Sequence, residues 1–303
     1  MNQPIHIKSI TVLHELLQIE KPKHPLISVF DFSSIVSNVS NYSNLQFTSD
    51  FYVVAIKQEC TGKFKYGQNY YDYDDGVMYF TAPNQVVQFE DMLLEVIRSK
   101  VLVIHQDFLY GYTLAATIKN YGYFSYATNE ALFLSVQEEQ VILDIFENIS
   151  KEINANIDSF TQDLLISNIE LLLKYNDRFY NRQFLTRKKV NSDLFIKLES
   201  LLDNSFKNEN LEQYGIPSVQ YIANELNLSP NYLSDMLRVQ TGQTTQQHIQ
   251  NRLIDKAKEL LSTTNLSVSE IAYQLGFEHS QSFHRLFKNR TNIAPLEFRQ
   301  SFN

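Results

Sequence analysis

The chain has 303 residues, of which 44% are hydrophobic and 20% charged, and these are ordinary proportions for globular domains. No apolar run reaches the roughly 20 residues that a membrane helix needs, and the amino terminus has no signal-peptide pattern, so we expect a cytoplasmic protein without membrane contact. The only cysteine, Cys60, excludes an intrachain disulfide framework and a thiolate metal cluster. The length is sufficient for two domains.

The formal net charge of −8 argues at first against a nucleic-acid-binding protein, because phosphate neutralisation dominates nonspecific DNA affinity. The chain has 16 basic and 22 acidic residues up to Val190, and 10 basic and 12 acidic residues after it. The later part is therefore weakly acidic, at −2. The basic residues are nevertheless clustered, and such clusters are compatible with a solvated face or with phosphate contacts. The clusters contain Arg178, Arg182, Arg187, Lys188 and Lys189, and then Arg238, Arg285, Lys288 and Arg290.

The first half of the chain has a β signature. From about Leu26 to Val136, short segments rich in Phe, Tyr and Val, such as 51–56 and 77–80, are separated by Gly, Asn and Asp. From Gln137 the apolar period becomes helical, and a second helical stretch follows around 164–173. The polar and basic segment 180–190 is expected to be a linker. We therefore expect a β-rich domain over 1–155, a helical segment with a linker over 156–190, and an all-helical domain over 191–303.

A nine-residue pattern occurs twice in the last part of the chain, at 218–226 and at 267–275. The two copies share Ser, Val, Ile, Ala and Leu at the same positions, 49 residues apart. In each copy the apolar residues form one stripe of a short helix, with Ser218 or Ser267 as its N-cap and Glu270 completing a capping box in the second. The repeat predicts one structural unit present in two copies.

Each short helix is followed by turn residues and a second helix. Ser229 and Pro230 are good helix starters, and Gly276 can take the left-handed conformation that ends a helix. The second helices have matching apolar positions and leave a polar outer face, as a helix that enters the major groove requires. These faces consist of Asn231, Ser234, Asp235 and Arg238 in the first copy, and of Gln281, His284, Arg285 and Lys288 in the second.

One copy alone would also fit an ordinary helical hairpin with a wet face. The segment between the copies, about 244–262, is a nearly uninterrupted helix. At about 1.5 Å per residue it spans on the order of 30 Å, close to the ~34 Å between successive major-groove faces of a duplex. Two copies at this separation favour a protein that occupies two consecutive grooves of double-stranded DNA.

These features resemble the AraC/XylS family of transcription regulators. The resemblance covers about Leu194 to Phe302 and is most specific in the second copy. Asn292 stands where the family commonly has Gly, and Phe298 stands for Tyr. The matching residues are Ile271, Ala272, Gly276, Phe277, Phe283, Arg285, Phe287, Lys288, Pro295, Phe298 and Arg299.

The resemblance implies that the second helix of each copy enters the major groove. Contacts to base edges are expected from Asn231, Ser234, Asp235, Ser280, Gln281, His284 and Arg285. Arg238 and Lys288 are expected to contact phosphates. Asp235 is the unusual member, because a carboxylate can accept from a cytosine amino group but repels phosphate. For His284, packing on the protein surface is an equal alternative.

The resemblance further implies a cupin-like amino-terminal barrel that binds a small molecule, and we expect Tyr66 and Tyr79 to line its pocket. These tyrosines could equally be core or sheet-surface residues without a ligand. An enzymatic cupin is disfavoured because His105 is the only histidine between Leu26 and Val136, whereas a catalytic metal needs clustered ligands. A DNA-repair regulator with a reactive cysteine is disfavoured because Cys60 has no partner thiol. We expect no enzyme activity, cofactor or metal.

The apolar residues around 164–173 are more numerous than one narrow stripe needs, which favours homodimerisation over burial against the chain's own β domain. Activation is the commoner mode in the family, so we expect an activator that acts with RNA polymerase. A ligand that reorients the linker could select which DNA sites are engaged. Control by a protein partner instead of a small molecule remains an alternative.

Overall fold

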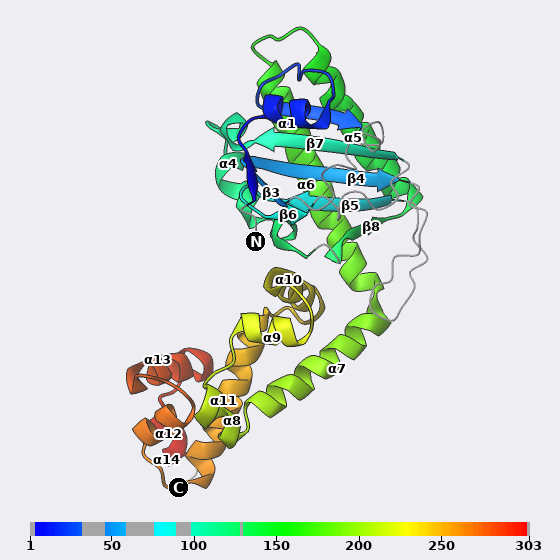
Figure 1. Ribbon diagram of the computed structural model, residues 1–303. Coiled ribbons are helices and arrows are strands. Elements are labelled where there is room, and N and C mark those ends of the chain that lie inside the picture. The colour runs from blue at the N-terminus through cyan, green and yellow to red at the C-terminus, as the bar shows by residue number, and fades with distance from the viewer. Residues whose placement is uncertain (1–3, 32–45, 59–75, 89–97, 128–129, 302–303) are drawn as a thin grey trace. The chain divides into compact units, whose positions relative to one another are not determined.

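The computed structural model describes residues 4–31, 46–58, 76–88, 98–127 and 130–301. Its internal contacts divide the chain into two units, Met1–Gln183 and Phe184–Asn303 (Figure 1). Each unit has its own buried core. Tyr66 and Cys60 lie outside the described residues.

The first unit contains two sheets. One has five strands in the order β2-β7-β4-β5-β8, and the other has three in the order β1-β3-β6. Neighbouring strands are antiparallel except for the parallel pair β1 and β3. The strands are β1 (Ile5–Ile7), β2 (Ile27–Asp31), β3 (Gln46–Ser49), β4 (Phe51–Gln58), β5 (Gly76–Thr81), β6 (Val87–Gln88), β7 (Arg98–His105) and β8 (Leu132–Leu134).

The sheet-rich amino-terminal part is therefore confirmed, including the two strands expected at 51–56 and 77–80. A cupin-like barrel is not confirmed, because the strands in the described part of the chain form two separate sheets rather than one closed barrel. The alternation of apolar and polar residues along a strand indicates which face of the strand is buried. It does not indicate which strands pair with one another, so it cannot predict a closed barrel.

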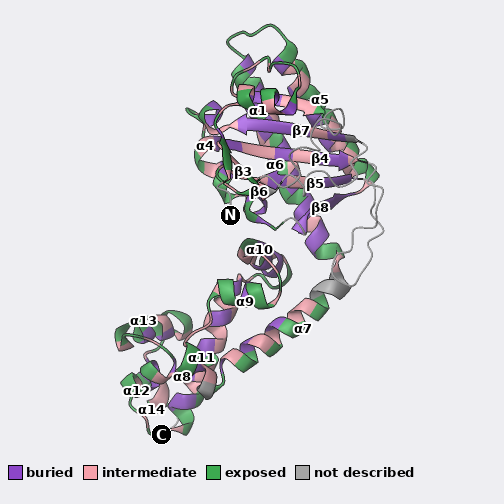
Figure 2. Ribbon diagram, viewed as in Figure 1, coloured by how far each residue is buried: buried purple, intermediate pink, exposed green. Residues whose placement is uncertain are grey.

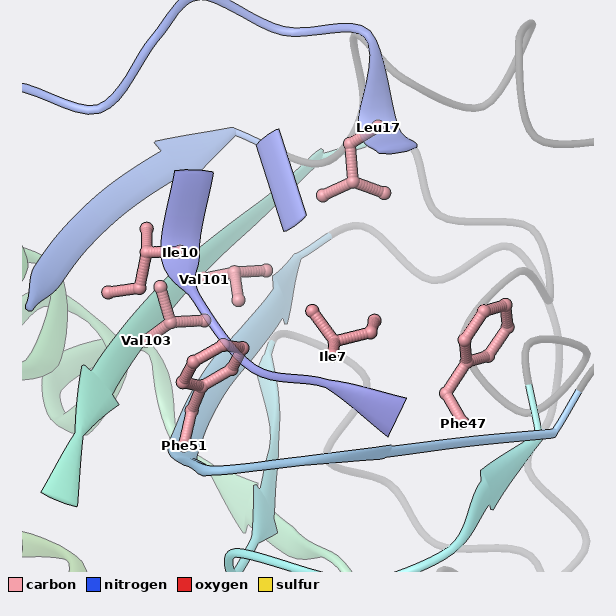
Figure 3. Close-up of a cluster of buried hydrophobic side chains, with 7 residues drawn as sticks. All are labelled: Ile7, Ile10, Leu17, Phe47, Phe51, Val101 and Val103. Atoms are coloured by element: carbon pink, nitrogen blue, oxygen red, sulfur yellow. The ribbon is translucent and has the colours of Figure 1, made fainter. Parts of the chain in front are cut away.

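Short helical elements and one longer helix accompany the strands. Helix α1 begins at the N-cap Ser9 and packs on β4 and β7 through Ile10 and Leu17. Figure 3 shows this cluster, in which side chains from β1, α1, β3, β4 and β7 gather. The elements are α1 (Ile10–Leu17), η2 (Gln106–Leu109), α4 (Leu114–Thr117), η3 (Ile118–Asn120) and η4 (Gly122–Ser125).

Helices α5 (Val136–Asn154) and α6 (Thr161–Thr186) follow the sheet. Ser135 and Glu138 form a capping box at the start of α5, and Glu138 also pairs with Arg182 of α6 at 2.5 Å. Gln183 of α6 accepts from the Phe133 backbone N–H and donates to the Ala131 carbonyl, which attaches α6 to β8. Most of the segment expected to be a linker is thus helical, because α6 continues to Thr186.

The second unit is all helical. Seven of its helices have the bounds α8 (Asn208–Tyr214), α9 (Val219–Glu225), α10 (Pro230–Thr241), α11 (Thr245–Thr263), α12 (Val268–Gln274), α13 (Ser280–Thr291) and α14 (Pro295–Gln300), and α7 (Lys188–Ser205) precedes them. Helix α11 contacts α9 and α10 as well as α12, α13 and α14, so it joins the two repeats predicted from the sequence (Figure 1).

None of the helices in the described part of the chain combines the length and the apolar character that crossing a membrane would need.

Candidate nucleic-acid interface

The first repeat forms a helix-turn-helix of α9 and α10. The Ser218 hydroxyl accepts from the Tyr221 backbone N–H at 3.1 Å, and Ile222 and Ala223 on the inner stripe are fully buried. The turn contains Asn227 at φ 56°, a left-handed conformation that asparagine tolerates. Ser229 then caps α10, and Pro230 occupies its first turn, as predicted.

The second repeat forms the same arrangement from α12 and α13. Ser267 and Glu270 make the predicted capping box, in which the Glu270 carboxylate accepts from the Ser267 backbone N–H at 2.6 Å. Hydrogen bonding to Ser267 lowers the pKa of Glu270. Gly276 follows α12 at φ 85°, the left-handed conformation expected of it, and Asn292 ends α13 at φ 65°. The asparagine in place of the family's glycine is therefore accommodated.

Helix α11 holds the two repeats together. Thr244 caps it, and Gln247 completes a capping box by accepting from the Thr244 backbone N–H at 2.8 Å. Its 19 residues correspond to about 28 Å at 1.5 Å per residue. The apolar stripe of α11 is buried between the repeats, and burial of each leucine or isoleucine side chain in it contributes roughly 1.5–3 kcal/mol. This stripe contains Ile249, Leu253, Ile254, Ala257, Leu260 and Leu261.

The outer face of α10 is partly buried (Figure 2). Asn231 and Arg238 are exposed, whereas Ser234 and Asp235 are half-buried. The Ser234 hydroxyl lies 3.0 Å from the hydroxyl of Thr245, which is fully buried at the start of α11. The Arg238 guanidinium pairs with the Asp235 carboxylate at 2.7 Å. A residue pair three apart on one helix thus brings a cation and an anion together on the face expected to meet DNA.

The outer face of α13 is more open. Gln281, His284, Arg285 and Lys288 are all exposed, and Ser280 is half-buried in the first turn of the helix. Phe283 and Phe287 on the inner side are fully buried and fix the rotation of the helix. This geometry presents donors and acceptors of four long side chains in one stripe. The two recognition faces therefore differ in character: α13 is open and basic, and α10 carries an internal ion pair.

Gly276 also lies close to the backbone of the segment that follows α8 and precedes the first repeat. A Cβ atom built at Gly276 would lie 3.1 Å from the Gly215 Cα and 3.2 Å from the Ile216 backbone nitrogen. Gly215 follows α8 at φ 70°. The turn of the second helix-turn-helix thus packs directly on the backbone that precedes the first.

Two arginines of this unit were not predicted as site residues, and both have contacts that the sequence does not reveal. Arg290 near the end of α13 donates to the Gln250 side chain of α11. Arg252 of α11 pairs with Glu199 at 2.7 Å and with Asp203 at 2.6 Å, both on α7. The partners lie about 40 and 50 residues away, beyond any local spacing rule.

The first unit contains a cavity of about 190 Å³. Tyr79, one of the two tyrosines predicted to line a pocket, is among its lining residues. Its role toward a ligand stays a prediction. Within the described ranges, no group of three or more His, Cys, Asp or Glu side chains is placed to hold a metal ion.

Comparison with known protein families finds a match within the second unit. A family described as "Helix-turn-helix domain" matches residues 222–301. The chain is 34% identical over 110 residues to the HTH-type transcriptional activator RhaS of Escherichia coli, in strain K12 / DH10B and in O9:H4 (strain HS). The match includes 34% of this chain and 40% of RhaS, so the chain spans less than half the length of these relatives.

Two solved structures are similar at low TM-score. The carboxy-terminal domain of the two-component response regulator yesN from Fusobacterium nucleatum is 29% identical, with 35% of this chain and 98% of that one covered and a TM-score of 0.31. A crystal structure of ToxT from Vibrio cholerae is 14% identical, with 91% and 97% covered and a TM-score of 0.27. At such TM-scores the likeness carries no structural argument.

Proposed function

Through its carboxy-terminal domain this chain belongs to the AraC/XylS family, and from this premise we propose a transcription regulator that binds double-stranded DNA with both helix-turn-helix units. A single observation carries the proposal: α10 and α13 both contact one connecting helix of about 28 Å, and each has a polar outer face. Successive major-groove faces lie about 34 Å apart. The length of the connecting helix is thus compatible with one chain that occupies two consecutive grooves.

The proposed roles of the side chains follow from their exposure. Gln281, His284 and Arg285 would reach base edges, and Lys288 would contact phosphate. Ser280 and Asn231 would contribute further base contacts at the starts of the two helices. On α10 the contribution of Ser234 is limited by its hydrogen bond to Thr245.

Asp235 and Arg238 are proposed for base and phosphate contact respectively, but each is engaged by the other in the free protein. An arginine paired with a carboxylate at 2.7 Å neutralises less phosphate charge than an unpaired one. We therefore expect α13 to supply most of the affinity and α10 to add sequence preference.

For the first unit we propose small-molecule sensing, with the cavity that Tyr79 lines as the binding site. The domain scheme of 1–155 for a cupin-like sensor, 156–190 for dimerisation and linkage, and 191–303 for DNA binding belongs to this proposal, as do activation through RNA polymerase and a cytoplasmic location. Control by a protein partner is the alternative. The curated relatives are named transcriptional activators, which speaks against a cupin-type enzyme.

Homodimerisation is proposed through α6. Leu165, Leu172 and Leu173 are buried within their own unit, so burial against the chain's own domain accounts for part of the apolar excess. Leu164 and Leu171, seven residues apart on one face of the helix, remain 48% and 44% exposed. We expect a Leu164→Glu, Leu171→Glu double variant to sediment as a monomer at concentrations where the parent protein is dimeric. A parent protein that is monomeric at those concentrations would contradict the dimer.

The decisive experiment is selection of genomic DNA fragments by the purified full-length protein at physiological salt. We expect one recurring site whose half-sites span two major-groove turns. A matched variant, Gln281→Ala with Arg285→Ala, should lose the base preference at the half-site bound by α13 and keep that of α10. Recovery of random fragments alone, with equal loss on all sequences as salt rises, would contradict sequence-specific regulation.

A further inference from the structure

The last turn of α6 belongs to the second unit. Although α6 runs from Thr161 to Thr186, the division of internal contacts assigns Phe184 and the residues after it to the second unit. Phe184 is 2% exposed, so its ring is part of a core, whereas the neighbouring Leu185 remains 55% exposed. The DNA-binding part of the chain, expected from the sequence to begin at 191, therefore also contains the end of α6.

The ring of Phe184 packs on the first recognition helix, α10. Its centroid lies 5.1 Å from the ring centroid of Tyr232, and the two ring planes are inclined at 75°. This edge-to-face arrangement is one that aromatic pairs favour, and it stabilises a contact beyond the area that it buries. Tyr232 lies in the first turn of α10 and is 4% exposed. The contact therefore holds the start of α10 against the end of α6.

A second contact joins Phe184 to the other end of α10. The side-chain amide of Gln240 donates to the backbone carbonyl of Phe184, with 3.5 Å between nitrogen and oxygen. Phe184 lies in the last turn of α6, where backbone carbonyls lack partners within the helix. Contacts near both ends of α10 restrain the rotation of this helix as well as its position.

The second recognition helix differs at the corresponding positions. Helices α10 and α13 both have 12 residues and begin 50 positions apart, at 230 and 280, so Tyr232 corresponds to Ser282 and Met236 to Leu286. Tyr232 and Met236 are buried, whereas Ser282 is exposed and Leu286 is half-buried. The flank that meets Phe184 on α10 is thus more open on α13.

We propose that Phe184 is a positioning residue for DNA reading by α10, and that it has no such effect on reading by α13. Hydrogen bonds to base edges weaken steeply when their angles change, so a recognition helix must be held at a fixed rotation. Buried Phe283 and Phe287 fix the rotation of α13 from within its own repeat. The inference rests on the proposed DNA-binding function and adds a dependence on α6 that only the first helix-turn-helix has.

The test compares the affinity of the full-length protein for three DNA duplexes. These are the selected site, the same site with the half-site of α10 scrambled, and the same site with the half-site of α13 scrambled. The Gln281→Ala, Arg285→Ala variant identifies the half-site that α13 binds. The ratio of affinities for the intact and the scrambled site measures the preference of one helix. A general loss of folded protein lowers all three affinities by the same factor, so it leaves both ratios unchanged.

In the parent protein each ratio should be at least about ten, since several mismatched base pairs are introduced together. Phe184→Ala should lower the α10 ratio to below about three and keep the α13 ratio within about two-fold of its parent value. The reason is that α10 loses the ring contact on its flank, whereas the core contacts of α13 are intact. An unchanged α10 ratio, or equal decreases in both ratios, would overturn the proposal.

Leu185→Ala is the matched control, because Leu185 is the next residue of the same turn but is mostly exposed. Both ratios should keep their parent values in it, and a fall of the α10 ratio as large as in Phe184→Ala would overturn the proposal. If Phe184→Ala fails to fold, Phe184→Leu decides, because leucine keeps an apolar side chain but removes the ring contact. The α10 ratio should then fall by about two-fold or more, and an unchanged ratio would overturn the proposal.

The failure of this inference is distinguishable from the failure of the proposed function. A parent protein that selects no DNA site contradicts both. A parent protein that selects a site, and whose Phe184 variants keep both ratios, retains the proposed function and loses the positioning role of Phe184 alone.

Discussion

Replacement of Gly276 by alanine tests the packing of the second helix-turn-helix. At φ 85° an L-residue costs about 1–2 kcal/mol, because its Cβ approaches the following carbonyl oxygen. The new methyl group would also meet the Gly215 Cα at 3.1 Å and the Ile216 nitrogen at 3.2 Å, and both are backbone atoms that cannot rotate away. Overpacking of this kind costs about 1–3 kcal/mol more.

Gly242 provides the matched control. It ends α10 at φ 75°, and nothing lies within 4 Å of a Cβ built there. Gly242→Ala should therefore have the conformational cost alone, and the difference between the two variants measures the contact with Gly215. We expect Gly276→Ala to lower the free energy of unfolding of the second unit by about 1–3 kcal/mol more than Gly242→Ala does.

The assay is hydrogen exchange of the full-length protein, followed by mass spectrometry of peptides from α11 and α13. Exchange at these buried helices reports the free energy of opening of the second unit, while peptides from α5 report the first unit as an internal reference. Equal losses in the two glycine variants would refute the reasoning, because they would show that the Gly215 backbone yields to the methyl group without cost.

Three further predictions concern DNA binding and pH. Arg285→Ala should weaken binding to a selected site by about 1–3 kcal/mol if Arg285 reads a base, whereas Arg285→Lys should keep affinity for random DNA; equal losses on both DNAs in electrophoretic titrations would reassign Arg285 to phosphate. Asp235→Asn should release Arg238 and steepen the dependence of log affinity on log salt by about 0.9, the increment of one phosphate contact; an unchanged slope in the same titrations would contradict this. Burial lowers the pKa of His14 below its ordinary 6.5, although the hydrogen bond to the Glu20 carbonyl raises it in part. Its stabilising contribution is therefore complete above pH 6.5 and is lost as pH falls from there through the lowered pKa, so His14→Gln should flatten the decline in urea stability of the first unit on that acid side. Parallel declines in variant and parent, followed by tyrosine fluorescence, would exclude His14 as the cause.

Local patterns predicted the second unit in detail. Ser218, Ser229 and Ser267 are N-caps in the structure, and Gly276 is left-handed, because a cap or a helix end depends on residues within one turn of it. The 49-residue repeat and the helix between its copies were likewise visible, since helical periodicity is a local property. The exposed stripe of α13 followed from the same periodicity.

Contacts between distant segments were not predictable in this way. The linker expected at 180–190 is largely helix α6, because Gln183 and Arg182 find partners on β8 and α5 about 45 to 50 residues earlier in the chain. Only the burial seen in the structure separates the leucines around 164–173 into two groups. Leu165 and Leu172 are buried within the first unit, whereas Leu164 and Leu171 are exposed.

The cavity is the clearest case of what tertiary structure alone decided. The sequence contained one signal for it, a lysine at an inward position of an alternating strand, but the tyrosines predicted to line a pocket were chosen by composition, and only Tyr79 is among the described lining residues. The position of Ser99 opposite Lys57 is likewise known only from the strand register in the structure. Strand alternation is determined by neighbours in sequence, whereas the register of two strands is determined by the packing of a whole sheet, and a slip of one residue would turn both side chains to the other face.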